Sequence, residues 1–305
     1  MPATGDSMKL NALVRGLVAA FNRRKPVRAG SLIVTLYGDA IVPRGGSLSL
    51  GDITQIMALF RIDSGHVRTA ISRLASEKWL ERRKSGRNTF YKLSKQGEGE
   101  FASATRRIYF SHKTEAGKPV RLALLNGEAS GRAAQRKQIE AEGFVAFNAL
   151  TYVSTQGGER APKRIKGVHY LTLPPSGETV EILCTAYRLD EIAARYREFT
   201  ALFGPLRDAL AKGAVLEDSE ALVVRLLLIQ EFRRIVLRDP ALLAALLPSG
   251  WPGEAARKLA AEIYSRVIEG SERYLGGCQA DETHRLPNPN SSLGQRFAAL
   301  QQELG

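Results

Sequence analysis

The sequence predicts a mixed α+β protein built from several domains. Near the N-terminus, two short amphipathic helical patterns precede a basic strand-turn-strand pattern. The middle of the chain alternates strand-like with helix-like segments, and long helical patterns dominate after residue 190. A chain of 305 residues is long enough to form two or three domains that each bury a core.

A helix-turn-helix is predicted between residues 49 and 76. The run Ser49–Asp52 has the pattern of a capping box, and apolar residues follow it at helical spacing. After a short turn, with Asp63 or Ser64 as N-cap, a second helix repeats this spacing. Two helices joined by so short a turn are typical of a DNA-binding helix-turn-helix.

The outward face of the second predicted helix carries small polar residues between basic ones. Arginine can reach guanine edges or phosphates, serine and threonine can bond either, and the helix N-terminus itself attracts phosphate. A face that merely meets water is the alternative interpretation. The DNA contacts predicted on this helix are Ser64, His66, Arg68, Thr69, Ser72 and Arg73.

A basic β-hairpin is predicted directly after this helix. Residues 79–84 and 89–93 have strand patterns around the turn Ser85–Asn88. Such a hairpin is a wing, which places positive charge along the DNA backbone or in the adjacent minor groove. The cations predicted to make these contacts are Arg82, Arg83, Lys84 and Arg87.

The charge of the chain is concentrated in this N-terminal part. Residues 1–113 carry 20 Lys and Arg against 8 Asp and Glu, a net charge of +12, whereas residues 114–305 carry 24 against 23. A positive field on one domain favours a polyanionic partner and gives salt-dependent affinity. A general excess of charge for solubility is the alternative.

The stretch from His66 to Leu74, followed by Trp79-Leu80, Gly86-Arg87 and Tyr91–Ser94, resembles the PaaX-type repressors of phenylacetate-degradation operons. Farther along, residues 196–199, 221–227 and 251–253 look like the C-terminal domain of that family. The resemblance implies a winged helix-turn-helix, a central ferredoxin-like domain related to CRISPR-associated nucleases, and a helical C-terminal domain. It also implies a repressor that an aryl-acetyl-coenzyme A thioester, typically phenylacetyl-CoA, releases from DNA.

The predicted domain organisation combines these patterns with the resemblance. A flexible arm (1–27) precedes the winged helix-turn-helix (28–95) and a connecting helix (96–116). The ferredoxin-like domain (117–189) has the order strand, helix, strand, strand, strand, with the last strand at Glu181–Tyr187. A helical domain for ligand and dimer contacts (190–276) and a loose tail (277–305), to which we assign no function, complete the chain.

No catalytic or metal-binding residue is predicted. Metal-dependent phosphodiester cleavage requires carboxylates around a hard cation, and the first central strand ends instead in Asn126-Gly127. His169 and Cys184 lack a third orienting group, so we do not propose them as a catalytic pair. A basic cluster could meet the phosphates of a coenzyme A effector, could add to the DNA footprint, or could be a solvated loop; it consists of Arg160, Lys163, Arg164 and Lys166.

These patterns together predict a cytoplasmic DNA-binding repressor without a cofactor. A homodimer would place two recognition helices in successive major grooves of a palindromic operator. Cys184 and Cys278 are few and far apart, which suits a reducing compartment, and no signal peptide or membrane span is visible. The alternatives are a metal-dependent nuclease, or a nucleic-acid adaptor without a small-molecule effector.

Overall fold

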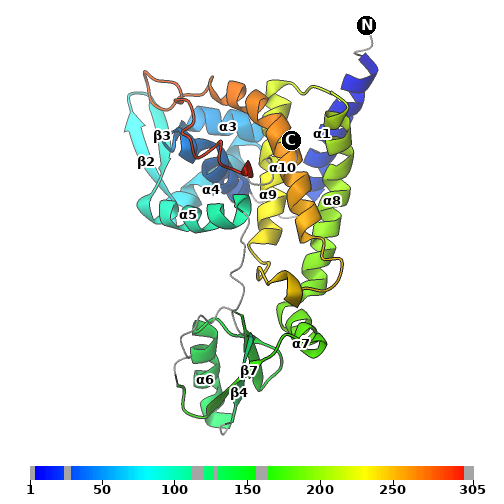
Figure 1. The fold of residues 1–305 in the computed structure, drawn as a ribbon. Coiled ribbons are helices and arrows are strands. Elements are labelled where there is room, and N and C mark those ends of the chain that lie inside the picture. The colour runs from blue at the N-terminus through cyan, green and yellow to red at the C-terminus, as the bar shows by residue number, and fades with distance from the viewer. Residues whose placement is uncertain (1–3, 24–28, 111–119, 127–128, 156–163, 299–305) are drawn as a thin grey trace. The chain divides into compact units, whose positions relative to one another are not determined.

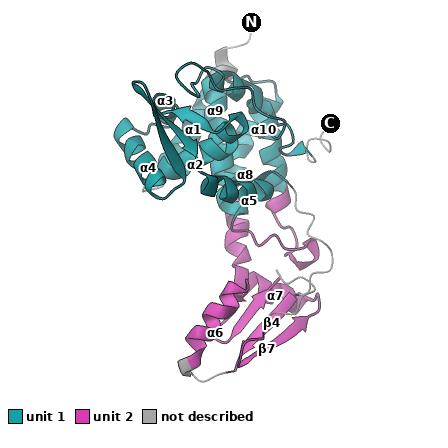
Figure 2. Cartoon of the chain, turned by 90° about the vertical axis from the view of Figure 1, so that its left-hand side faces the viewer, with its two compact units in different colours: residues 1–111, 198–237, 255–305 teal, residues 112–197, 238–254 magenta. Residues whose placement is uncertain are grey.

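The chain forms a mixed α+β fold with two compact units. The computed structural model describes residues 4–23, 29–110, 120–126, 129–155 and 164–298. Unit 1 comprises residues 1–111, 198–237 and 255–305, and unit 2 comprises residues 112–197 and 238–254 (Figure 2).

Unit 1 contains a small N-terminal domain, residues 29–94, which we call the head. Its short strands form one antiparallel sheet in the order β1-β3-β2, and its helices α3 and α4 are joined by a short turn (Figure 1). The helix α5 follows the sheet directly. The bounds are α2 (Ala29–Leu36), β1 (Ser47–Ser49), α3 (Leu50–Ala58), α4 (Ser64–Ser76), β2 (Leu80–Ser85), β3 (Asn88–Leu93) and α5 (Lys95–Tyr109).

Local sequence determines where the head's helices begin. The Ser49 side chain accepts a hydrogen bond from the Asp52 backbone N–H at 3.0 Å, which caps α3 as the sequence pattern predicts. The Ser94 side chain caps α5 in the same way. The helix α2 continues past Leu36 into a π-helical segment, η1 (Tyr37–Ile41), and a 3₁₀ turn, η2 (Val42–Arg44).

Four longer helices complete the framework of unit 1. Its most deeply buried helix is α9, whose residues 221–232 are all buried within this single chain. The core of the chain itself therefore buries this apolar run. The bounds are α1 (Thr4–Arg23), α8 (Leu189–Ala211, of which residues 198–211 belong to unit 1), α9 (Asp218–Val236) and α10 (Gly253–Leu275).

The prediction of a flexible arm over residues 1–27 is wrong for most of its length. Residues 4–23 form the helix α1, which packs against α9. The buried side chains Leu10, Val14, Leu17 and Phe21 recur at helical spacing, and Phe21 makes an edge contact with Phe60 of the head. Burial of this apolar stripe offsets the conformational entropy that the segment loses when it becomes ordered.

Unit 2 contains a four-stranded antiparallel sheet in the order β5-β6-β4-β7. Its core consists of Ala123 and Leu125 of β4 packed with Ile139 of α6, together with Phe144 and Tyr152. All the strand pairs of this sheet are antiparallel. The bounds are β4 (Val120–Leu125), α6 (Ala129–Ala141), β5 (Val145–Ala146), β6 (Thr151–Ser154), β7 (Val168–Leu173) and α7 (Gly177–Tyr187).

The strand predicted at Glu181–Tyr187 is instead the helix α7. The Ser176 side chain caps this helix by accepting from the Thr179 backbone N–H at 3.2 Å. The buried residues Thr179, Leu183 and Ala186 have helical rather than alternating spacing. The cap and the helical spacing of the buried residues thus both favour a helix here.

The expectation of a loose tail after residue 277 is also wrong within the described residues. Leu286, Leu293 and Phe297 are buried in unit 1. The ring of Phe297 makes an edge contact with Tyr109 of α5, with centroids 5.4 Å apart. None of the helices in the described part of the chain is long and apolar enough to cross a membrane.

Candidate nucleic-acid interface

The helix α4 has one buried face and one exposed face. Its buried residues Val67, Ala70, Ile71 and Leu74 are those that the sequence pattern predicted for the core. The predicted DNA-contacting residues on the opposite side are all exposed, so no described segment of the chain covers them. They are Ser64, His66, Arg68, Thr69, Ser72 and Arg73.

The N-terminus of α4 is occupied by the chain's own carboxylate. Asp63, one of the two predicted N-caps, accepts hydrogen bonds from the backbone N–H groups of Gly65 and His66, each at 3.0 Å. Its other oxygen contacts the imidazole of His66. The backbone hydrogen bond from His66, followed by the bond from its side chain, lowers the pKa of Asp63 below its ordinary value. These two backbone N–H groups are therefore already hydrogen-bonded within the chain.

The exposed polar side chains of α4 differ in their freedom to bind a partner. Thr69 Oγ1 donates to the Gly65 carbonyl at 3.0 Å. Arg73 forms an ion pair with Glu77 at 3.6 Å, and its guanidinium lies over Gly30, where a Cβ atom would approach it to 2.9 Å. Arg68 has no hydrogen-bond or ion-pair partner among the described residues and is the cation of α4 best placed to reach a base edge.

The hairpin β2-β3 has the predicted register and turn. Ser85 pairs with Asn88, which leaves Gly86 and Arg87 as the two turn residues. Gly86 has φ +50°, as the first central residue of a type II′ turn requires. The predicted cations Arg82, Arg83, Lys84 and Arg87 are all exposed.

These cations lie on both faces of the hairpin. Side chains alternate along a strand, so Arg82 and Lys84 share the face of buried Leu80, whereas Arg83 lies on the face of its partner Phe90. A duplex that meets this hairpin from either side therefore encounters positive charge.

The C-terminal tail runs beside the head's sheet (Figure 1). The Ser49 backbone N–H donates to the Gln279 carbonyl at 3.2 Å, and the Ser47 hydroxyl donates to the Ala280 carbonyl at 2.8 Å. The tail then turns at residues 281–284 and places the Glu282 carboxylate against Gly86, where a Cβ atom would collide with it. An acidic side chain thus lies at the tip of the basic hairpin.

A buried ionic cluster joins the head to the helices of unit 1. Asp39 of η1 and Arg225 of α9 are both fully buried, and Arg225 Nε lies 2.5 Å from Asp39 Oδ2. Arg296 of the tail lies 2.8 Å from Asp39 Oδ1. The hydroxyls of Tyr109 and Tyr264 donate to the same carboxylate at 2.5 Å and 3.0 Å.

Glu272 of α10 extends this cluster. Arg225 Nη1 contacts Glu272 Oε1 at 2.5 Å, and Arg44 Nε donates to Glu272 Oε2 at 2.8 Å. Burial raises the pKa of Asp39, but the nearby Arg225 and Arg296 outweigh that effect and hold it below its ordinary value. The residues of this cluster are not among those predicted from the sequence. Its one visible sign is an arginine inside the apolar run of α9.

The predicted effector cluster is only partly described. Arg164 and Lys166 are exposed in unit 2, whereas Arg160 and Lys163 lie outside the described residues. Burial raises the pKa of the Cys184 thiol, and burial raises that of Cys278 to about 12, so both thiols stay protonated near neutral pH. The described residues include no group of three or more His, Cys, Asp and Glu that could hold a metal ion.

Comparisons with known proteins agree with this arrangement of domains. A family model described as PaaX-like protein matches residues 28–97, which contain the head, and the PaaX-like protein C-terminal domain matches residues 187–277. The chain is 31% identical over 313 residues to the transcriptional repressor PaaX of Escherichia coli strain K12, covering 96% of each sequence.

A solved structure, the uncharacterized protein Rv0674 from Mycobacterium tuberculosis, is 18% identical to this chain. It aligns with a TM-score of 0.44 over 72% of this chain and 88% of its own, which is too weak a likeness to carry an argument. The two family matches and the near full-length similarity to the E. coli repressor show that the chain belongs to the PaaX-like family of transcriptional repressors.

Proposed function

We propose that this PaaX-like repressor binds double-stranded operator DNA with the helix α4 in the major groove and the hairpin β2-β3 on the backbone. The observation that carries the proposal is that all the predicted contact residues lie exposed on one strongly basic head. Arg68 reads a base edge, because it is the exposed arginine of α4 without a partner among the described residues. The wing cations neutralise phosphates and contribute little sequence preference.

The proposed mechanism of regulation is release by an aryl-acyl-CoA, such as phenylacetyl-CoA, from the operator of an aromatic catabolic operon of the phenylacetate type. A homodimer in the cytoplasm presents two heads to a palindromic site about one helical turn apart. The effector binds the released conformation more tightly than the DNA-bound one. The ratio of these two affinities sets the largest decrease in DNA affinity that the effector can cause. Similarity to the E. coli repressor supports the repressor role.

The decisive experiment measures DNA binding by fluorescence anisotropy. The purified protein is titrated into labelled duplexes tiling the promoter next to its gene, at several salt concentrations, with and without phenylacetyl-CoA. We expect one tile to bind far more tightly than the others, and the thioester to release it. Free coenzyme A and phenylacetate are the controls. Equal affinity for every tile would contradict the operator assignment.

Two further assays address the alternatives. If the thioester releases the protein from none of the duplexes, and no acyl-CoA raises the melting temperature of the protein, the chain is better explained as a nucleic-acid adaptor without an effector. Cleavage of labelled RNA or DNA with Mg²⁺ or Mn²⁺ would favour a nuclease.

A further inference from the structure

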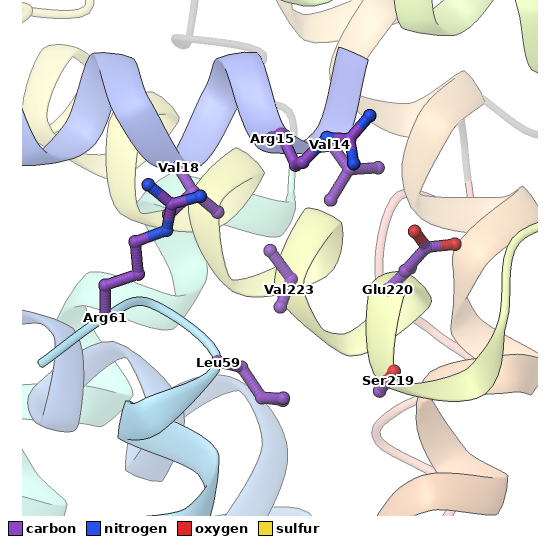
Figure 3. Close-up of a pocket in the computed structure, with 8 residues that line it drawn as sticks. All are labelled: Val14, Arg15, Val18, Leu59, Arg61, Ser219, Glu220 and Val223. Carbon is purple, nitrogen blue, oxygen red and sulfur yellow. The ribbon is translucent and has the colours of Figure 1, made fainter. Parts of the chain in front are cut away.

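A cavity of about 180 Å³ lies in unit 1 between the helix α1, the turn that joins α3 to α4, and the first turns of α9 (Figure 3). It lies outside the proposed DNA-contacting residues. Its lining residues are Val14, Arg15, Val18, Leu59, Arg61, Ser219, Glu220 and Val223.

The floor of this cavity is apolar. Val14, Val18 and Val223 are each no more than 5% exposed, and Leu59 is half-buried. An engineered, fully apolar cavity of roughly 150 Å³ admits benzene, whereas half of the residues that line this one are charged or polar. A single ring or a short hydrocarbon chain is therefore the size of group that the space at α1 and α9 can hold.

Two arginines border this apolar floor. Arg15 comes from α1, Arg61 comes from the turn before α4, and both are exposed (Figure 3). Neither guanidinium has a hydrogen-bond or ion-pair partner among the described residues. Free guanidinium groups beside an apolar wall suit a ligand that combines a carboxylate with a hydrocarbon.

The one acidic side chain in the lining is already engaged. Glu220 Oε2 accepts from the backbone N–H of Glu217 at 3.3 Å, as part of the capping box of α9. With its amide oriented to suit its neighbours, Asn11 also donates to Glu220 Oε1 at 2.6 Å. The acceptors of Glu220 thus serve α9 and Asn11, which leaves the two arginines as the groups available to an anion.

We propose that this cavity binds a small monocarboxylate whose hydrocarbon part is one ring or a short chain. The carboxylate lies between Arg15 and Arg61, and the hydrocarbon packs on Val14, Val18 and Val223. The site is lined both by the turn of the helix-turn-helix and by α9. This site includes none of the proposed DNA contacts and none of the residues of the predicted effector cluster.

Isothermal titration calorimetry on the full chain tests this proposal. Phenylacetate and hexanoate are the probes, and phenylacetamide is the neutral counterpart of phenylacetate. We expect saturable binding of a carboxylate probe and at least about tenfold weaker binding of the amide, because charge-assisted hydrogen bonds are lost. Arg15→Gln and Arg61→Gln should each weaken probe binding by about tenfold for the same reason.

The matched control is Arg23→Gln, which removes an exposed arginine from the last turn of the same helix and should leave affinity unchanged. Leu59→Phe should block the probe by filling the cavity, and circular dichroism checks that the variant is folded. If Leu59→Phe does not fold, the exposed Arg15→Gln still decides the case. No saturable binding of either carboxylate at millimolar concentration, or binding that neither arginine substitution weakens, would overturn the proposal.

Discussion

The basic surface of α4 and the ionic cluster around Asp39 are two charged regions of one unit with opposite environments. Every predicted contact residue on α4 is exposed, whereas Asp39 and Arg225 are fully buried. Charge on α4 is free to meet a partner from outside. Charge in the cluster is neutralised by groups from distant parts of the same chain.

The two regions therefore contribute to the molecule in different ways. Exposed cations contribute little to folding stability but can provide much of the affinity for DNA. Removal of one partner from a buried ion pair leaves an uncompensated charge, which is strongly destabilising. We therefore expect substitutions in the cluster to change stability and substitutions on α4 or the hairpin to change DNA affinity.

The largest expected effect is that of Asp39→Asn. The substitution leaves Arg225 and Arg296 facing a neutral group in a buried site, so the free energy of unfolding should fall by about 3–5 kcal/mol. Urea denaturation followed by circular dichroism measures this. Asp208→Asn, at an exposed carboxylate on α8, is the control and should change stability by less than about 1 kcal/mol.

The difference in free energy of unfolding between the natural chain and Asp39→Asn has a defined pH dependence, which gives a sharper test. The folded-state pKa of Asp39 lies below its ordinary value, so its stabilising effect is complete above the unfolded pKa of about 3.9 and is lost as pH falls through the folded value. The stability gap between the natural chain and Asp39→Asn should thus be the same at pH 7 and pH 5. A gap that shrinks between those values would contradict the assignment of Asp39 as an ionised partner of Arg225.

The next largest effect is that of Arg68→Ala on operator affinity. Loss of a contact to a base edge should weaken specific binding by about 1–3 kcal/mol and relax sequence preference, with the melting temperature unchanged. Arg73→Ala should weaken operator binding less than Arg68→Ala does, because Arg73 forms an ion pair with Glu77. Fluorescence anisotropy with operator and mutated-operator duplexes measures both effects.

The control for these variants is Arg266→Ala, at an exposed arginine of α10. It should leave DNA affinity unchanged. If Arg68→Ala weakens operator and unrelated DNA equally, Arg68 contacts phosphate rather than a base. If Arg73→Ala has the larger effect, the ion pair with Glu77 does not hold in the complex.

The head could be predicted from the sequence because its information is local. Caps such as Ser49, the spacing from Val67 to Leu74 and the turn at Gly86 each specify structure within a few residues. The exposure of the predicted contact residues followed from the same periodicity, since the face opposite a buried stripe must meet solvent unless another segment covers it.

The buried cluster and the path of the tail could not be predicted in this way. Asp39, Arg225 and Arg296 meet only after η1, α9 and the tail have packed together, and the local sequence around each of these residues does not specify the other two. The predictions for residues 4–23 and 177–187 were wrong for related reasons. The first segment was predicted to be an unstructured arm, and part of the second, a capped helix, was predicted to be a strand. Long-range packing decides such cases.

A smaller effect is expected for Lys84→Ala on the wing. Since Lys84 contacts phosphate in the proposed complex, the substitution should weaken binding to all duplexes similarly. It should also reduce the magnitude of the slope of log K against log salt concentration by about 1. Lys212→Ala removes an exposed lysine outside the head and should leave that slope unchanged. A loss confined to the operator sequence would instead assign Lys84 to base reading.

The smallest expected effect, and one of opposite sign, is that of Glu282→Gln in the tail. The Glu282 carboxylate lies against Gly86 at the hairpin tip, so it repels an approaching phosphate and screens the wing cations. Its neutralisation should raise affinity for all duplexes by roughly two- to fivefold at low salt, which is less than about 1 kcal/mol, and the gain should fade as salt increases. Glu198→Gln makes the same charge change at an exposed site on α8 and should produce no gain. Anisotropy titrations at two salt concentrations separate the outcomes: a loss of affinity on Glu282→Gln would mean that the tail orders the wing for DNA rather than competing with it.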